Sequence, residues 1–429
     1  MTPPTITAEP PRPALPAQRG SRLQRRATIG AIAALLGATA VAQQSTARVA
    51  PESVGLSPAR LTEATELLKR EIAQQHIAGA VAAVARRGRV GYLEALGVQD
   101  LETRVPMRER SLFRIYSMTK SITAVAVMML HEQKRFTLDD PIPTFIPEFR
   151  DIRVIGEPGE AHAPARPITV RDLLMHTSGL NHRTSEIYRR EQVRSRTSTM
   201  AQFIANLVRV GLMEDPGTRY RYSEATTVLG RLVEIWSGQP FDVFLETRIL
   251  GPLKMHDTMF AALTADQRAR LTTVYGAAPG GGLTKVETET VPFTERPALI
   301  EGAVGLLSTV PDYLRFAQML LNKGELDGVR LLRATTVEMM TTNGLSNEVL
   351  SVRGGSTGWG LANVDVALAP AANNPVRPGE FGWDGTAGTI FWIDPGKDVV
   401  TILMTASSPA NPERIRQRFK ALVQQAVVD

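Results

Sequence analysis

The sequence predicts an α+β fold, in which an antiparallel sheet is flanked by helices and interrupted by an inserted, mainly helical subdomain. The first observation is that β-rich runs lie near both ends of the chain, at 78–85, 90–97, 388–393 and 398–405. The second is that the turn signals Arg86-Arg87-Gly88 and Asp394-Pro395-Gly396 join these runs into two pairs. The third is the largely helical pattern over 170–323, which lies between the pairs. Strands from the two ends are therefore expected to share one sheet.

The helices follow from apolar periodicity at helical spacing. We expect them at 61–75, from Ser117 to about 134, and at 170–175, 200–210, 226–237, 241–249, 311–321 and 412–427. The run 124–130 is almost wholly apolar and predicts a helix buried all round. Residues 181–199, with five arginines, and the glycines 280–282 are expected to form loops that could rim a cleft. The walls of that pocket would come from 181–199 and 276–297.

Composition bounds the class of protein. The 429 residues with 43% hydrophobic content are ordinary for a globular protein of one or two domains. Of the formal charge of +6, residues 1–42 contribute +4 through five arginines and one glutamate. The remaining +2 is too small to indicate a nucleic-acid or anionic-membrane surface. The absence of cysteine excludes disulfides, thiolate metal sites and a cysteine nucleophile.

Residues 1–42 are predicted to be an export signal of the twin-arginine type. Arg25-Arg26 precede a modest apolar run at 29–38, and Ala40-Val41-Ala42 offers a small-residue cleavage site. Thr28 departs from this pattern, because the signal prefers an aromatic residue there. A disordered tail with a short membrane anchor is the alternative. We expect a linker at 43–58, one domain over 59–429, and a soluble periplasmic or secreted protein without stable membrane insertion.

Ser117-Met118-Thr119-Lys120 is the most informative motif. A serine and a lysine three residues apart lie on one helix face, one turn from each other. Lysine can then take the proton of the serine hydroxyl, which is the S-x-x-K arrangement of a nucleophile with its base. By itself the pattern is also compatible with a helix-capping serine and a chance lysine.

Two further motifs accompany it. Tyr222-Ser223-Glu224 runs into the helix at 226–237, and a tyrosine beside a serine–lysine pair can shuttle protons as a phenol or phenolate. Gly382-Trp383-Asp384-Gly385-Thr386 opens a late strand, where a strand N–H can face a developing oxyanion. Each motif alone could instead be structural, as a core tyrosine or as a turn before a strand.

Taken in this order, the three motifs resemble those of the class C β-lactamase and penicillin-binding protein superfamily, and within it the family VIII carboxylesterases. The resemblance covers roughly residue 51 to the C-terminus and includes the blocks 138–141, 168–180, 228–234 and 302–308. It implies a β-lactamase/transpeptidase-like fold, no cofactor and no metal. It also implies an ester or amide substrate of small-molecule size.

By this resemblance, Ser117 is the acylated nucleophile, Lys120 is its general base, and Tyr222 relays protons to the leaving group and the deacylating water. The backbone N–H groups of Ser117 and Thr386 would form the oxyanion hole, with Trp383 and Gly385 beside the substrate. A serine at a helix start agrees with this assignment, because the positive end of the helix dipole faces the developing charge.

Two positions depart from the lactamase and peptidase pattern. Glu224 stands where those enzymes carry asparagine, and Trp383 stands where they carry lysine or histidine. An indole in place of a cation removes the partner of a substrate carboxylate and enlarges the apolar wall, which suits an uncharged ester. Both changes favour an esterase, while the roles of Glu224 and Asp384 stay open.

Two other patterns in the sequence could indicate a different kind of site. Gly354-Gly355-Ser356-Thr357-Gly358 fits the G-x-S-x-G elbow, but all six histidines precede Ser356 and the stretch leads into no helix. His176 and His182 lack the spacing of metal ligands, and we expect His176 to bond to backbone.

The sequence therefore predicts an exported serine hydrolase that cleaves carboxylic esters through an acyl-enzyme on Ser117. Other outcomes remain: a β-lactamase, a D-alanyl-D-alanine carboxypeptidase, or an enzyme that transfers the acyl group to an acceptor other than water. A catalytically silent homologue that binds cell-wall fragments or a protein partner is also possible, although the intact Ser117, Lys120 and Tyr222 argue against it.

Overall fold

The computed structural model describes residues 47–155, 160–370 and 376–428. The predicted export signal, 1–42, and the first part of the predicted linker lie outside the described residues. Within the described residues no helix is long and apolar enough to cross a membrane.

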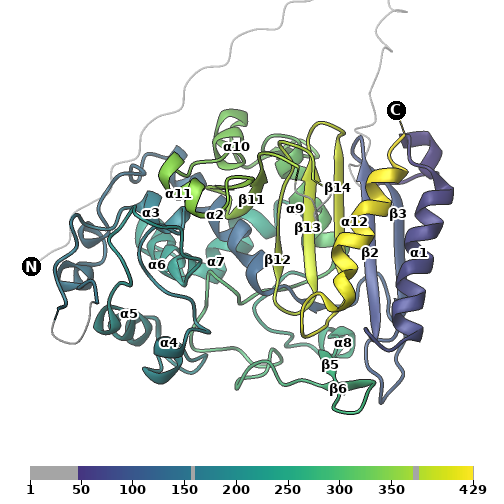
Figure 1. Cartoon of the computed structure of the whole chain (residues 1–429), viewed down its shortest axis with the longest axis horizontal. Helices are drawn as coiled ribbons and strands as arrows, with labels where there is room; N and C mark the ends of the chain where they lie inside the picture. The colour runs from purple at the N-terminus through teal and green to yellow at the C-terminus, as the bar shows by residue number, and fades with distance from the viewer. Residues whose placement is uncertain (1–46, 156–159, 371–375, 429) are drawn as a thin grey trace, which may run out of the picture. The chain divides into compact units, whose positions relative to one another are not determined.

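The centre of the fold is a sheet in the order β1-β3-β2-β14-β13-β12-β11-β10 (Figure 1). All neighbours pair antiparallel except β1 and β3, which pair parallel. Its strands are β1 (Ala47–Arg48), β2 (Gly79–Arg86), β3 (Arg89–Gly97), β10 (Thr357–Gly360), β11 (Val364–Ala367), β12 (Phe381–Gly385), β13 (Thr389–Asp394) and β14 (Val399–Met404). The expected sheet, shared by the two ends of the chain, is confirmed by the pairing of β2 with β14.

The helices are α1 (Pro58–Ala73), α2 (Thr119–Glu132), α3 (Val170–Leu174), α4 (Glu186–Arg190), α5 (Met200–Val210), α6 (Ala225–Ser237), α7 (Phe241–Leu245), α8 (Ala265–Arg270), α9 (Val310–Leu321), α10 (Ala334–Met340), α11 (Asn347–Val352) and α12 (Ile415–Ala426). Single turns are η1 (Pro51–Val54), η2 (Tyr116–Met118), η3 (Ile142–Thr144), η4 (Pro147–Asp151), η6 (Pro412–Arg414) and the π-helical η5 (Glu246–Leu250). Two-stranded pairs are β4 (Phe113–Arg114) with β7 (Leu307–Ser308), β5 (Tyr275–Ala277) with β6 (Leu283–Lys285), and β8 (Glu325–Leu326) with β9 (Val329–Arg330).

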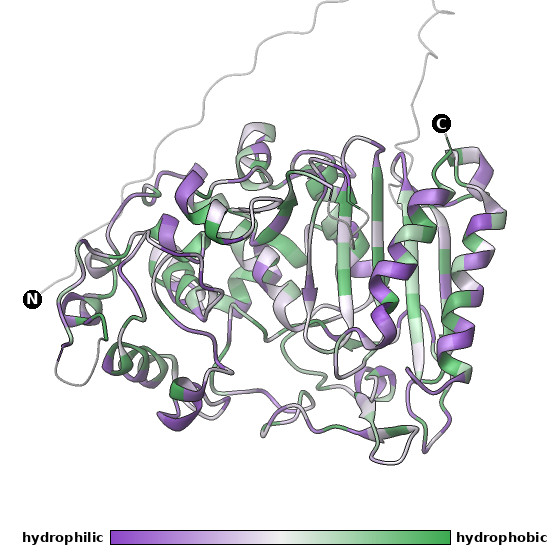
Figure 2. Cartoon of the chain, viewed as in Figure 1, coloured by the Kyte–Doolittle hydropathy of each residue, from purple (hydrophilic) through white to green (hydrophobic). Residues whose placement is uncertain are grey.

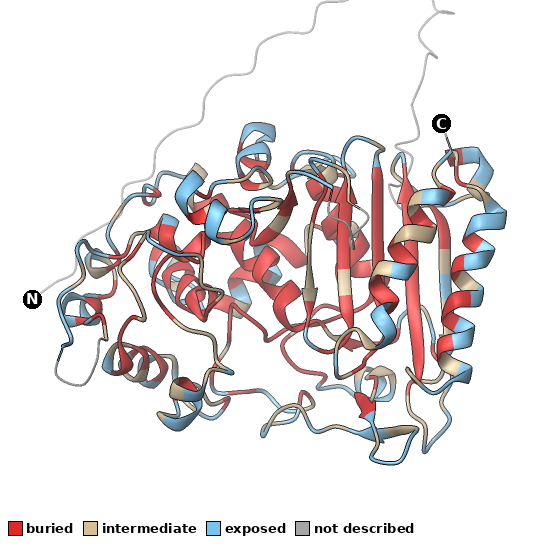
Figure 3. Ribbon diagram, viewed as in Figure 1, coloured by how far each residue is buried: buried red, intermediate tan, exposed pale blue. Residues whose placement is uncertain are grey.

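Helices cover both faces of the sheet. α1 and α12 pack on one face, where Leu67, Trp392 and Phe419 belong to one apolar cluster. α2 and α9 lie on the other face, in the larger core that also includes α6 and α7. The predicted all-round burial of 124–130 is confirmed, since every one of these residues is at most 6% exposed. α2 is accordingly red along most of its length in Figure 3.

Local sequence signals explain where two helices begin. The hydroxyl of Ser57 caps α1 and Pro58 occupies its first turn, so this helix starts three residues before the predicted position. Thr169 and Asp172 form a capping box that starts α3. Strands β13 and β14 are mostly apolar, which matches their burial between two helical layers (Figure 2).

Several expectations about elements were incomplete. Residues 181–199 contain α4, and 276–297 contain β6 and part of β5, with the glycines 280–282 in the turn between these two strands. The motif at 382–385 does not open β13; it forms a strand of its own, β12, which pairs with β13. β10 and β12 carry two glycines each, and β11 has only four residues, so none of the three shows an extended apolar alternation. Within the predicted linker, Val54 and Leu56 are buried against the sheet domain.

Candidate active site

Ser117 lies on the 3-10 turn η2, directly before α2, rather than inside the helix itself. The preceding residue, Tyr116, has a φ of 41°, a left-handed conformation that a bulky residue rarely adopts. Such strain is common where a chain turns sharply to present a functional group. Ser117 is only 6% exposed, so its hydroxyl faces a confined space beside the start of α2.

Lys120 is fully buried one helical turn further on. Its Nζ lies 3.4 Å from Ser117 Oγ and donates a hydrogen bond of 3.0 Å to the carbonyl oxygen of Ala303. Burial disfavours the charged amine and lowers the pKa of Lys120 to about 7, while the negative charge of Glu224 opposes this shift. A lysine with this pKa is partly neutral at physiological pH, and a neutral amine can accept the proton of Ser117.

Tyr222 is brought to the same place by the segment that leads into α6. The Nζ of Lys120 lies 4.7 Å from the centre of its ring. Burial raises the pKa of Tyr222 above its ordinary value, and a hydrogen bond with Ser117 only partly offsets this. Tyr222 is therefore a phenol, and the phenolate alternative raised by its closeness to Lys120 is not supported.

Trp383 has a contact that its sequence position did not reveal. Its indole N–H donates to the hydroxyl of Tyr222 at 3.1 Å, and the two rings lie 5.2 Å apart. An indole can only donate, so it occupies an acceptor position of Tyr222 and leaves the phenol proton for another partner. His182 stacks on the Tyr222 ring, and Trp359 meets Trp383 edge-on at 4.7 Å, which completes an aromatic wall.

Glu224 is fully buried beside the predicted base. One carboxylate oxygen accepts from the hydroxyl of Thr227 at 3.0 Å, and the other has no hydrogen-bond partner among the described residues. Burial favours the protonated acid, but the positive charges of Arg183 and Lys120 outweigh it and lower the pKa of Glu224. An ionised Glu224 thus acts on Lys120 through its charge.

The end of β12 packs directly against the turn that carries Ser117. A Cβ built on Gly385 would lie 2.3 Å from the carbonyl oxygen of Ile115, so only glycine permits this approach. Thr386, which is exposed, follows in the turn between β12 and β13. The assignment of the Ser117 and Thr386 N–H groups to an oxyanion hole remains a prediction.

Asp384 plays a structural part on the other side of β12. Its carboxylate pairs with Arg416 of α12 at 2.9 Å, and Arg416 also donates to the carbonyl oxygens of Gly385 and Thr389, both at 2.8 Å. Successive side chains of a strand point to opposite faces, so Trp383 reaches Tyr222 while Asp384 reaches the helix behind the sheet.

His176 holds the tyrosine segment by backbone contacts, as its place in the sequence predicted. The N–H of Ser223 donates to Nδ1 of His176 at 3.2 Å, and the N–H of Arg221 donates to its carbonyl oxygen at 2.8 Å. Burial lowers the pKa of His176 well below its ordinary value, so the ring is neutral and Nδ1 can accept. In the part of the chain that the structure describes, no group of His, Asp or Glu side chains could hold a metal ion.

Ser356 does not have the surroundings of a nucleophile elbow. It occupies the turn between α11 and β10, and no helix follows it. The nucleophile-elbow geometry needs a strand that leads through the serine into a helix, so this motif carries no such site.

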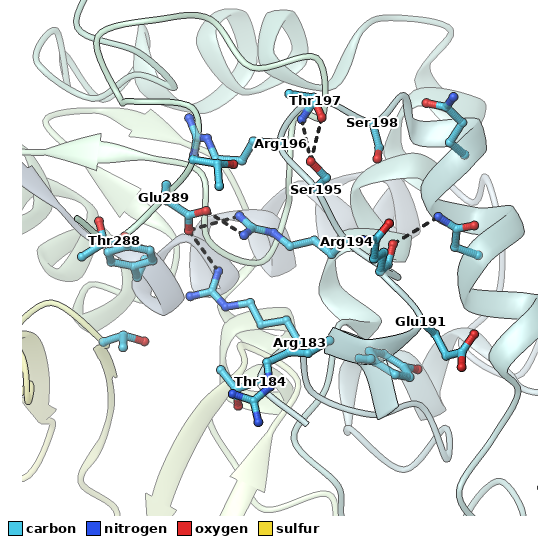
Figure 4. Close-up of a pocket in the computed structure, with 18 of the residues that line it drawn as sticks. Arg183, Thr184, Glu191, Arg194, Ser195, Arg196, Thr197, Ser198, Thr288 and Glu289 are labelled. Carbon is cyan, nitrogen blue, oxygen red and sulfur yellow. Dashed lines mark hydrogen bonds and ion pairs between the residues drawn. The ribbon is translucent and has the colours of Figure 1, made fainter. Parts of the chain in front are cut away.

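A cavity of about 1150 Å³ opens beside the serine, although Ser117, Lys120 and Tyr222 themselves do not line it (Figure 4). One part of its wall is formed by Tyr116, which precedes the predicted nucleophile, and by Thr386, which is a predicted oxyanion donor. The loops 181–199 and 276–297 supply much of the rest, as the sequence predicted, including Arg183, Arg194, Arg196 and Glu289. The charged side chains of this wall were not predicted from the sequence.

The fold and the buried serine–lysine–tyrosine cluster define a serine hydrolase of the penicillin-recognising type. The chain belongs to the β-lactamase family, whose model matches residues 64–426.

Relatives in this family include proteins of different named activities. An uncharacterised protein of Mycobacterium tuberculosis is 34% identical over 350 residues, covering 78% of this chain and 86% of the relative. Esterase EstB of Burkholderia gladioli is 27% identical over 379 residues, covering 83% and 93%. A putative D-alanyl-D-alanine carboxypeptidase of Escherichia coli is 26% identical over 388 residues, covering 84% and 85%.

Solved structures share the fold. EstCE1, described as a hydrolase with promiscuous acyltransferase activity, superimposes with a TM-score of 0.76 at 24% identity, covering 85% of this chain and 98% of that one. Simvastatin synthase (LovD) from Aspergillus terreus superimposes with a TM-score of 0.72 at 21% identity, with the same coverage. The β-lactamase/transpeptidase-like fold expected from the sequence is therefore confirmed.

Proposed function

We propose that this protein is an exported serine hydrolase that cleaves carboxylic esters through an acyl-enzyme on Ser117. The observation that carries the proposal is the fully buried Lys120, whose Nζ lies 3.4 Å from Ser117 Oγ and whose pKa burial lowers to about 7. A neutral amine that donates to the Ala303 carbonyl oxygen still has its lone pair, which can accept the hydroxyl proton.

In the proposed acylation step, Ser117 Oγ attacks the ester carbonyl while its proton passes to Lys120. The tetrahedral intermediate collapses, the alcohol leaves with a proton supplied through Tyr222, and Ser117 stays esterified. Water then attacks the acyl-enzyme, loses its proton to the same pair, and releases the carboxylic acid and free Ser117. The phenol state of Tyr222 suits the role of proton donor to the leaving oxygen.

The preference for esters rests on the wall beside Tyr222. Trp383 presents an aromatic surface, and its only hydrogen-bond donor is already bound to the tyrosine hydroxyl. It therefore has no donor left for a substrate carboxylate there. The likeness to Esterase EstB over most of both chains supports the same reading. The likeness to a putative D-alanyl-D-alanine carboxypeptidase keeps that activity as the second candidate.

The test is hydrolysis of a short-chain p-nitrophenyl ester and of a chromogenic cephalosporin by the purified protein, beside Ser117→Ala. We expect rapid ester cleavage, a much smaller lactam signal, and loss of both in the variant. Lactam turnover faster than ester turnover would reverse the assignment. Activity that survives Ser117→Ala would remove Ser117 from the mechanism.

Export by the twin-arginine route is a separate proposal, because it rests on residues 1–42 alone. Cell fractionation of a bacterial host that expresses the full chain tests it. We expect the protein outside the cytoplasm, and retention in the cytoplasm when Arg25 and Arg26 are both changed to lysine. Equal distribution of the two proteins would contradict the route.

A further inference from the structure

The wall of the cavity beside Ser117 contains more positive than negative charge. Arg194 pairs at hydrogen-bond distance with both Glu289 and Glu301, at 2.7 and 2.6 Å. Arg183 makes an ion contact of 3.7 Å with Glu289 and interacts with Glu224 through its charge, but its Nη1 is buried without a hydrogen-bond partner among the described residues. Figure 4 shows Arg183 and Arg194 converging on Glu289.

Arg196 is the most unusual member of this wall. It is 1% exposed, and none of its three guanidinium nitrogens has a hydrogen-bond partner in the described parts of the chain. Its guanidinium carbon lies 4.1 Å from the centre of the Phe293 ring. Burying a cation without hydrogen-bond partners is unfavourable, and the nearby carboxylates of Glu301 and Glu289 act on Arg196 only through their charge.

The two under-partnered cations flank the turn that carries the nucleophile. Arg183 lies over the ring of Tyr116, 5.3 Å from its centre, and the Tyr116 and Phe293 rings meet edge-on at 5.8 Å. A negative group bound here would therefore lie close to Ser117, whose neighbour in sequence is Tyr116. The glutamates nearby are already engaged, because Glu289 and Glu301 hold Arg194.

We propose that this cavity binds a carboxylate of the ester substrate, carried on the acyl chain away from the scissile bond. This inference rests on the proposed esterase function, and it names the substrate class as esters of dicarboxylic acids. Trp383 makes the surroundings of Tyr222 apolar, and the arginines of the 181–199 loop supply positive charge at a different place. Low-dielectric walls on which one sign of charge is in excess concentrate the opposite charge between them.

The test compares two p-nitrophenyl esters of adipic acid, one with a free second carboxylate and one with that carboxylate as its methyl ester. In the unmodified protein we expect kcat/KM for the free acid to exceed that of the neutral ester by about tenfold or more, as for a charge-assisted hydrogen bond. In Arg196→Met the ratio should fall to about one. Arg190→Met is the matched control, because Arg190 is exposed on the same loop and does not line the cavity.

Thermal unfolding separates a binding role from a structural one. Methionine is apolar and similar in length, so Arg196→Met removes the buried cation, and we expect its Tm to equal or exceed that of the unmodified protein. A lower Tm with an unchanged ratio would make Arg196 structural and overturn the proposal. If Arg196→Met does not fold, Arg183→Met carries the same comparison.

A binding measurement keeps this inference distinct from the esterase proposal. Calorimetric titration of Ser117→Ala with adipate, and with its neutral dimethyl ester, needs no turnover. Tighter binding of adipate that is lost in Ser117→Ala/Arg196→Met would support the site even if no ester is hydrolysed. Equal binding of the two ligands, or a kcat/KM ratio at or below one in the unmodified protein, would overturn it.

Discussion

Lys120 shows how burial sets the chemistry of a single residue. The same amine in water would be charged at neutral pH, and desolvation lowers its pKa to about 7. The pKa is depressed relative to the unfolded chain, which binds more protons between pH 7 and about 10.5, so this group's contribution to folding stability rises with pH across that window. Below pH 7 the folded state carries the full cost of a buried charge.

The acid limb of the pH profile should report Lys120. We expect kcat/KM for a neutral ester to rise with pH through about 7, since only the neutral amine accepts the Ser117 proton. Glu224 raises the pKa of Lys120, so Glu224→Gln should move the limb to lower pH. Glu186→Gln, an exposed change of the same kind, should leave it in place. A limb unmoved by Glu224→Gln would show that its charge does not reach Lys120.

Trp383 is predicted to position Tyr222 through its N–H. Trp383→Phe keeps an aromatic wall but deletes the 3.1 Å hydrogen bond, and we expect kcat to fall up to about tenfold with little change in KM. Trp392→Phe on the far face of the sheet is the matched control.

A double mutant distinguishes positioning from general damage. In a Tyr222→Phe background, Trp383→Phe should cause little further loss, because the partner of its N–H is already absent. Additive losses would mean that Trp383 acts independently of Tyr222.

At the scale of elements, β12 and η2 form the part of the site that depends most on close approach. β12 directs Trp383 towards Tyr222 and Asp384 towards Arg416, and its glycine end lies against Ile115. The strand thereby connects the nucleophile turn on one side with α12 on the other. The position of Ser117 depends on this contact as well as on its own turn.

Gly385→Ala tests that contact. The added Cβ would lie 2.3 Å from both the Ile115 carbonyl oxygen and the Thr389 hydroxyl, so backbone must move. We expect Gly385→Ala to lower the free energy of unfolding by about 1–3 kcal/mol. We expect it to lower kcat/KM by a larger fraction than it lowers this free energy. Gly396→Ala, where the added Cβ has only an ordinary 3.4 Å contact, should change neither by much. Unaltered activity in Gly385→Ala would mean that β12 does not position Ser117.

At the scale of the molecule, the sheet ties the two ends of the domain together. β2 near the start pairs with β14 near the end, and α1 and α12 cover the face that lies away from the site. The cluster of Ser117, Lys120 and Tyr222 lies on the opposite side, where Tyr222 packs against the core that includes α2 and α6. The proposed chemistry therefore lies on one face of the sheet, and the packing of α1 and α12 on the other.

Phe419→Ala should show that the packing of α12 and the proposed chemistry are independent of each other. Phe419 is fully buried in α12 and contacts the rings of Tyr92 and Trp392, so its truncation should cost about 3–5 kcal/mol of unfolding free energy. The kcat/KM of the protein that remains folded should be unchanged, as measured at a temperature well below the lowered Tm. A proportional loss of activity in fully folded protein would show coupling across the sheet.

Much of the fold was predictable because its signals are local. The hairpin of β2 and β3, the buried α2 and the strands β13 and β14 each follow from a continuous apolar pattern and a turn. β10, β11 and β12 were missed, since β10 and β12 are rich in glycine and β11 has only four residues, too few to show a periodicity. Short elements within the loops, such as α4, depend on contacts with the rest of the chain.

The sequence by itself determined the family and which residues to examine: Ser117 and Lys120 by helical spacing, and Tyr222 by the family's motif order. The direction of each side chain on β12 was left to the tertiary structure, and with it the Trp383–Tyr222 bond and the turning of Asp384 towards Arg416. The tertiary structure also decided the phenol state of Tyr222 and left the guanidinium of Arg196 without hydrogen-bond partners among the described residues. The physical reason is that hydrogen bonds between distant segments, and the burial that shifts a pKa, exist only once packing has brought those segments together and removed water.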